Sequence, residues 1–208
     1  AELADGDRRH VLIEYSAPNT NKPLHLGHVR NNCLGQALVG ILRRAGHRVT
    51  AVNLVNDRGI HICKSMVAYQ RFGNGETPTS AGMKGDHLVG KYYVKYAEEL
   101  RRQADALRQD NDELTDRDDD ALAPETEIGR AAQEMLVQWE AGDDHVLKLW
   151  RTMNGWVLDG FDATYKRMGI EFDRVYYESE TYKLGRDLID DGLARGVFFF
   201  NDTATTEI

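Results

Sequence analysis

The sequence predicts an α/β protein whose parallel sheet is interrupted by a long, mostly helical insertion. Near the N-terminus, two segments rich in β-forming residues alternate with two segments of helical periodicity. From about residue 86 to residue 170 only the helical period is present. A strand, helix, strand, helix order favours parallel strands joined by a right-handed crossover, and the long helical stretch then lies outside the sheet.

The first strand and the helix after it are predicted from residues 10–45. Residues 10–16 (HVLIEYS) form a short β-rich run, and residues 17–24 carry the prolines and asparagines typical of a loop. From Leu26 the apolar residues recur at spacings of three and four, and Gly46 follows as a natural C-cap. We therefore expect a strand, a loop and then a helix of about five turns.

The remaining elements follow from the same periodicities. A second β-branched strand, a turn and a helix are expected over residues 49–55, 56–59 and 60–72. In the insertion, helices are expected over residues 86–109, after Pro124 and from Asp143 to Met168, with their Trp and Met side chains in the core. Towards the C-terminus we expect an extended segment, a helix and the start of a strand over residues 172–179, 181–195 and 197–200.

Two charged segments of the insertion have ordinary interpretations. Residues 110–120 contain seven acidic residues in eleven, which predicts a solvated, mobile loop. Lys91, Tyr92, Tyr93, Lys95 and Tyr96 are typical of a half-buried amphipathic helix, although an aromatic and basic face could also contact nucleic acid.

Composition limits the classes of function. The 208 residues are 41% hydrophobic and 29% charged, as in globular domains, and the net charge of -8 argues against a non-specific nucleic-acid binder. We find no run of about 20 apolar residues and no secretory signal, so we expect a cytoplasmic protein without a membrane span. The two cysteines, Cys33 and Cys63, are expected to be buried free thiols.

The chemistry concentrates where the first strand passes through its loop into a helix. A helix start at the carboxyl edge of parallel strands presents free N–H groups and the positive end of the helix dipole, which bind phosphate. His25 and His28, three residues apart, can both donate hydrogen bonds to an α-phosphate oxygen, and Gly27 lets a nucleotide ring approach the backbone. Lys22 either adds positive charge near a phosphate or is a solvated loop residue.

A zinc-binding module is the remote alternative. His25, His28, His61, Cys33 and Cys63 are all metal-ligand types, but they lack the paired Cys-x-x-Cys spacing of structural zinc sites. We therefore expect no metal-ligand set in the protein.

These residues also carry a family resemblance. His25-Leu-Gly-His28 is similar to the HIGH signature of class I aminoacyl-tRNA synthetases and related nucleotidyltransferases. The preceding Ser16-Ala-Pro-Asn19, followed by Lys22, looks like the arginyl-tRNA synthetase form. The resemblance covers about residues 11–198 and implies a Rossmann-like parallel sheet, of which this chain is the HIGH-type nucleotidyltransferase half.

Two further segments resemble the family. Residues 53–59 (NLVNDRG) are similar to Asn-His-x-Gly-Asp-Trp-Gly, with Asn53, Asp57 and Gly59 matching. Asn56 and Arg58 depart from that pattern, so the resemblance assigns them no role. Residues 154–180, which include YKRMGIEFD, also look like the family.

The resemblance implies an activity and its residues. Arginine would react with ATP, carrying substrate-bound Mg²⁺, to give arginyl-adenylate, and the arginyl group would pass to the 3′ end of tRNA(Arg). The implied catalytic residues are His25 and His28, and the implied ATP-binding residues are Lys22, His25, Gly27 and His28. The implied arginine-binding residues are Glu14, Ser16, Asn19 and His25. Glu14 has an alternative interpretation as a solvent-exposed strand residue, and Asn19 as a turn residue that caps its own backbone.

The resemblance also implies an organisation. We expect residues 1–72 to form the first half of the catalytic domain, 73–170 the insertion, 171–200 a truncated return to the catalytic domain, and 201–208 a non-native tail. On this interpretation the chain is a fragment of a longer protein and is expected to be inactive alone. We expect the parent protein to be a monomer and to contact tRNA mostly through regions outside this chain. Another HIGH-type nucleotidyltransferase or another class I synthetase remains the nearest alternative.

Overall fold

The computed structural model describes residues 8–197, apart from the side chains of residues 186 and 187. Within this range the sheet contains three parallel strands in the order β1 (His10–Glu14), β2 (Arg48–Val55) and β3 (Arg174–Tyr177). Val52 lies opposite both Glu14 and Arg174, so β1 pairs with the first part of β2, and β3 pairs with its second part. The predicted α/β class and parallel sheet are confirmed.

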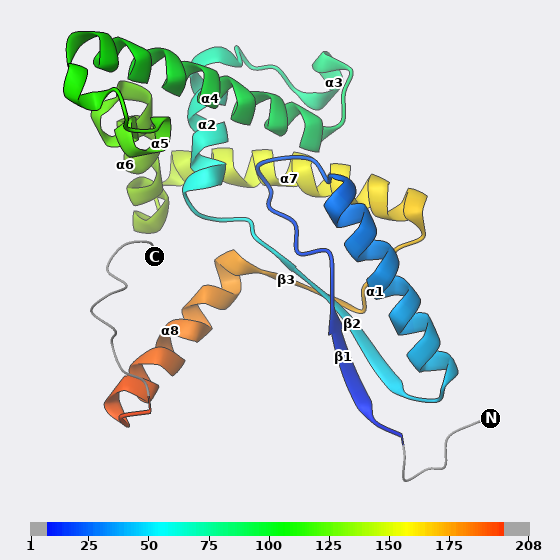
Figure 1. Cartoon of the computed structure of the whole chain (residues 1–208). Coiled ribbons are helices and arrows are strands. Elements are labelled where there is room, and N and C mark those ends of the chain that lie inside the picture. Colours follow the sequence, from blue (N-terminus) through cyan, green and yellow to red (C-terminus); the bar gives the residue numbers. More distant parts are fainter. Residues whose placement is uncertain (1–7, 198–208) are drawn as a thin grey trace.

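Helix α1 (Leu26–Arg44) connects β1 to β2 and packs along them (Figure 1). Gly35 makes this close packing possible, because a Cβ at that position would lie 2.2 Å from a ring carbon of Tyr15. The Tyr15 hydroxyl lies 2.8 Å from Gln36 Oε1 and 2.7 Å from the Glu171 carbonyl oxygen, and shares its one hydrogen between them. The segment that precedes β3 is thereby tied to the crossover helix.

The other helices form a second, larger core. Buried residues of α2, α4, α6 and α7 make up this core, among them Met66, Leu88, Ile128 and Met153. Figure 1 shows these helices clustered beyond the carboxyl ends of β1 and β2, with α8 projecting away from them. The bounds are α2 Ile60–Phe72, α3 Pro78–Ala81, α4 Gly85–Asp110, α5 Asp119–Leu122, α6 Glu127–Ala141, α7 Asp144–Met168 and α8 Glu178–Ala194, with short 3-10 helices at Asp112–Leu114 and Ala123–Glu125.

Helix α2 belongs by packing to the insertion. The sequence grouped it with the first two strands, yet its buried residues Ile62, Cys63, Met66 and Val67 lie in the same core as those of α4, α6 and α7. The change of packing partner therefore falls in the turn between β2 and α2, before residue 60.

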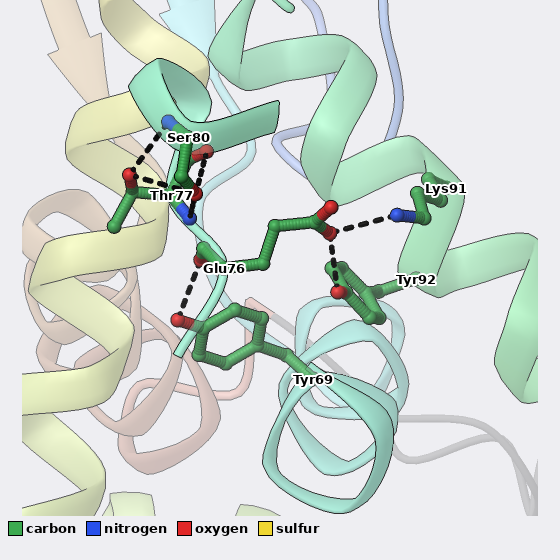
Figure 2. A network of polar contacts seen from close by, with 6 residues as sticks. All are labelled: Tyr69, Glu76, Thr77, Ser80, Lys91 and Tyr92. Carbon is green, nitrogen blue, oxygen red and sulfur yellow. Dashed lines mark hydrogen bonds and ion pairs between the residues drawn. The ribbon is translucent and has the colours of Figure 1, made fainter. Parts of the chain in front are cut away.

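A polar network holds the loop between α2 and α4 in place (Figure 2). The Glu76 carboxylate accepts from Lys91 Nζ at 2.7 Å and from the Tyr92 hydroxyl at 2.6 Å, and the Tyr69 hydroxyl donates to the Glu76 carbonyl at 2.8 Å. Tyr92 and Tyr96 are buried whereas Lys91 is exposed, so α4 is the half-buried amphipathic helix that the sequence predicted.

The acidic segment after α4 contains short helices where the sequence predicted a loop, and most of its residues are exposed to solvent, as predicted. It contains a 3-10 helix and α5, and basic side chains neutralise part of its charge. Arg108 pairs with Asp119 at 2.7 Å, and Arg117 pairs with Glu125 at 2.6 Å. The Asp118 side chain accepts from the Ala121 N–H and caps α5. Charge counting along the sequence could not foresee partners supplied by neighbouring turns.

The two cysteines differ in exposure. Cys63 is buried, and burial raises the pKa of its thiol to about 12. Cys33 is exposed on α1, so its predicted burial was wrong, because α1 buries only the face that carries Asn32, Gly35 and Val39.

Of the strand expected over residues 197–200, residues 198–200 lie outside the described part, as does the tail at 201–208. No helix in the described range is long and apolar enough to cross a membrane.

Candidate active site

The loop after β1 runs along the end of β2 and delivers the chain to the start of α1. The Tyr15 N–H donates to the Val52 carbonyl at 3.1 Å, and the Thr20 N–H donates to the Asn56 carbonyl at 3.0 Å. The Asn56 N–H donates back to the Pro18 carbonyl at 2.9 Å. These bonds fix the loop on the carboxyl edge of the sheet, the edge at which such folds bind nucleotides.

The predicted arginine-binding residues occupy different environments. Glu14 is the last residue of β1 and is exposed, and Asn19 is exposed where its backbone bridges to Asn56. Ser16 is only 2% exposed, and its hydroxyl lies 2.6 Å from the Tyr165 hydroxyl. Glu14 and Asn19 are therefore available to a ligand, whereas the Ser16 hydroxyl is occupied inside the protein.

The side chains of His25 and His28 cap the start of α1 and lie against each other. His25 is the N-cap, its Nδ1 accepts from the Gly27 N–H at 3.1 Å, and His28 Nδ1 accepts from the His25 N–H at 3.2 Å. The ring centroids lie 4.0 Å apart. Because each Nδ1 is an acceptor, the proton of each neutral ring lies on Nε2. The pair therefore presents two N–H donors from the helix start.

Gly27 makes room for this arrangement. A Cβ on Gly27 would lie 2.8 Å from Cε1 of His25, so a side chain there would push the capping ring away. Gly27 is itself exposed, which also leaves its backbone open to a ligand. The glycine between the histidines therefore has a steric reason that the sequence pattern alone did not reveal.

The histidines His28 and His61, at the starts of α1 and α2, both have lowered pKa values. Burial lowers the pKa of His28, and the nearby His25 and Lys22 lower it further. Burial also lowers the pKa of His61, at the start of α2, with Lys64 and Lys22 contributing. The charge of Lys22 contributes to the lowering of both pKa values. His61 was considered in the sequence only as a metal ligand.

The turn between β2 and α2 joins three parts of the chain. Asp57 is 4% exposed, and its carboxylate accepts from the Ser179 N–H at 2.8 Å and from the Ser179 hydroxyl at 2.7 Å. Its carbonyl accepts from Trp150 Nε1 at 2.7 Å and from Asn154 Nδ2 at 3.1 Å. Asp57 therefore links the carboxyl end of β2 to α7 and to the start of α8.

Arg58, for which the sequence assigned no role, is part of the same joint. Its guanidinium lies 3.8 Å from the centre of the Tyr182 ring in α8 and pairs with Glu140 of α6 at 3.2 Å.

Among residues 8–197, no group of three or more His, Cys, Asp or Glu side chains is placed to hold a metal ion.

The sheet, the crossover helix and the histidine pair at its start define the catalytic fold of class I aminoacyl-tRNA synthetases. The family model described as "tRNA synthetases class I (R), catalytic domain" matches residues 2–205. The chain belongs to this family.

Comparison with individual relatives agrees with this assignment. The chain is 58% identical over 193 residues to an arginine–tRNA ligase of Amoebophilus asiaticus, and 54% identical over 189 residues to one of Bacteroides thetaiotaomicron. These alignments cover 93% and 91% of the chain but only 32% and 31% of the relatives. The chain therefore spans about a third of the length of these curated relatives.

Solved structures give the same fold. The arginyl-tRNA synthetase of Thermus thermophilus superposes with a TM-score of 0.63 at 28% identity, covering 89% of this chain and 26% of that one. The arginyl-tRNA synthetase of Plasmodium falciparum gives 0.58 at 16% identity, covering 88% and 27%, and supports the fold alone.

Proposed function

We propose that the protein containing this chain is an arginine:tRNA ligase. It activates arginine with ATP to arginyl-adenylate and transfers the arginyl group to the 3′ end of tRNA(Arg). The observation that carries the proposal is the His25–His28 pair, which caps the start of α1 through its Nδ1 atoms and leaves both Nε2–H groups available to a ligand. The chain that carries this pair is 58% identical to a protein named arginine–tRNA ligase.

In this proposal, the arginine carboxylate attacks the α-phosphorus of ATP, and pyrophosphate leaves. Negative charge builds on the α-phosphate oxygens as the new bond forms, and the Nε2–H groups of His25 and His28 donate to them. Lys22 adds positive charge near the two helix starts. Mg²⁺ would be held mainly by the phosphate oxygens of ATP, which suits a cation that retains few protein ligands.

Arginine recognition is assigned to the exposed groups of the loop. Glu14, at the carboxyl end of β1, can receive the guanidinium in charge-assisted hydrogen bonds, and the Asn19 amide can serve both the ammonium and the carboxylate groups. We also propose that the parent is a cytoplasmic monomer. Its contacts with tRNA are assigned largely to regions outside this chain, consistent with the net charge of -8.

Exchange of labelled pyrophosphate into ATP tests the proposal in the full-length protein containing this chain. Each of His25→Ala and His28→Ala should lower kcat by roughly 10²- to 10³-fold while changing the arginine KM little, because the lost donors act on charge present only in the transition state. His145→Ala, an exposed histidine on α7, is the matched control and should keep the wild-type kcat.

Substrate identity is tested separately. Glu14→Gln should weaken arginine binding by about 1.5 to 3 kcal/mol and leave ATP binding unchanged, with the exposed Glu134→Gln on α6 as control. A screen of all amino acids in the exchange assay discriminates the nearest alternative, another HIGH-type enzyme. Exchange that depends on an amino acid other than arginine would refute the proposed substrate.

A further inference from the structure

The loop that carries the proposed arginine-binding residues contains an unfavourable turn. Ser16 and Ala17 have φ angles of 77° and 46°, two of the three residues other than glycine with positive φ in the described range. Residues with a Cβ rarely adopt this left-handed conformation, and it persists only where surrounding contacts enforce it. The turn lies between Glu14 and Asn19, so its shape sets their relative position.

Two side chains from outside the loop hold the turn in place. The Ala17 N–H donates to Asn53 Oδ1 at 3.1 Å, and Asn53 is 1% exposed in β2. The Ser16 hydroxyl lies 2.6 Å from the Tyr165 hydroxyl on α7. The turn is therefore held by one residue of β2 and one residue of α7.

The Tyr165 ring is fixed by packing that does not involve its hydroxyl. It makes an edge contact with Phe172 at 5.2 Å between centroids and a tilted contact with Phe161 at 6.4 Å. Burial raises the pKa of Tyr165, so the hydroxyl stays protonated at neutral pH. The polar tip is thus the part of this residue that reaches the loop.

We propose that Tyr165 is a positioning residue for arginine recognition. Its hydroxyl, presented by the last turns of the inserted helix α7, holds the Ser16–Ala17 turn so that Glu14 and Asn19 face the same substrate. A displacement of α7 is then transmitted to the arginine pocket through this hydroxyl. The proposal rests on the proposed function, since it names which substrate's binding depends on the residue.

The test is Tyr165→Phe in the full-length protein, which removes the hydroxyl and keeps the ring. The Ser16 hydroxyl loses its partner inside the protein, and an unpaired buried group corresponds to roughly a 5- to 160-fold effect. We expect a rise of that size in the arginine KM, with the ATP KM unchanged. A purely structural role would lower the active fraction, and therefore the apparent kcat, without changing either KM.

Tyr92→Phe is the matched control. It also removes a buried tyrosine hydroxyl, the one bonded to Glu76 in the insertion (Figure 2), but away from the loop. This variant should lose stability and keep the wild-type arginine KM. Equal arginine KM values for Tyr165→Phe and Tyr92→Phe would overturn the positioning role.

Ser16→Ala gives a second route if Tyr165→Phe does not fold, because it removes the same hydrogen bond and leaves the Tyr165 side chain unchanged. The two substitutions should be non-additive, so that the double variant raises the arginine KM no more than the stronger single variant. Additive effects, or an unchanged KM in Ser16→Ala, would overturn the proposal. If the wild-type protein shows pyrophosphate exchange only with another amino acid, the proposed function fails. The positioning role of Tyr165 is then tested by the effect of Tyr165→Phe on the KM for that amino acid.

Discussion

Replacing Asp57 by alanine should destabilise the chain strongly, although the residue lies in a turn. Its carboxylate is almost completely buried and accepts two hydrogen bonds from Ser179, at 2.8 and 2.7 Å. A hydrogen bond to a charged group contributes about 1.5 to 3 kcal/mol. Ser179 is half-buried, so water can replace part of the lost hydrogen bonding, and we expect the free energy of unfolding to fall by about 3 kcal/mol in total. For a chain of this length that is a fall in Tm of about 6 to 12 °C.

Thermal and urea unfolding of the 208-residue chain measure this loss. Asp57→Asn keeps one acceptor oxygen and should lose about half as much stability, while the exposed Asp159→Ala on α7 should change it little. The carbonyl of residue 57 still accepts from Trp150 and Asn154 in every variant, so the amides at the start of α8 should lose protection from hydrogen exchange first. An Asp57→Ala variant within about 0.5 kcal/mol of wild type would refute this account of the joint.

Three other outcomes follow from the structure. An NMR titration should give His28 a pKa below 6.5, and His25→Ala should raise that pKa; an unchanged pKa in the variant would contradict the coupling of the two histidines. The stability that neutral His28 contributes is complete above about pH 6.5 and is lost as the pH falls below that value. A thiol reagent should modify Cys33 and spare Cys63 in the native chain, whereas equal rates would mean that the second thiol is accessible. Gly35→Ala should destabilise the chain by about 1 to 3 kcal/mol in urea unfolding, because the added methyl group lies 2.2 Å from an anchored tyrosine ring; a neutral result would show that α1 can shift.

The sequence predicted most elements because their signals are local. The run at residues 10–16, the apolar spacing from Leu26 and the Gly46 cap gave a strand and helix that the structure places at His10–Glu14 and Leu26–Arg44. The histidine pair was found for the same reason, since residues three apart at a helix start are neighbours whatever the rest of the chain does. The short helices in the acidic segment were not predicted, because the pairing of Asp119 with Arg108 and the cap that Asp118 provides to α5 leave no helical periodicity in the sequence.

The sequence by itself thus determined the fold class, the order of the elements, and the His25–His28 pair at the first helix start. Only the tertiary structure decided what holds that site in shape. The Ser16–Tyr165 contact joins residues 149 positions apart, and the Asp57–Ser179 contact joins residues 122 apart. Neither has a local pattern, because such partners are brought together by contacts of α7 and the start of α8 with the segments that follow β1 and β2, and not by spacing along the chain.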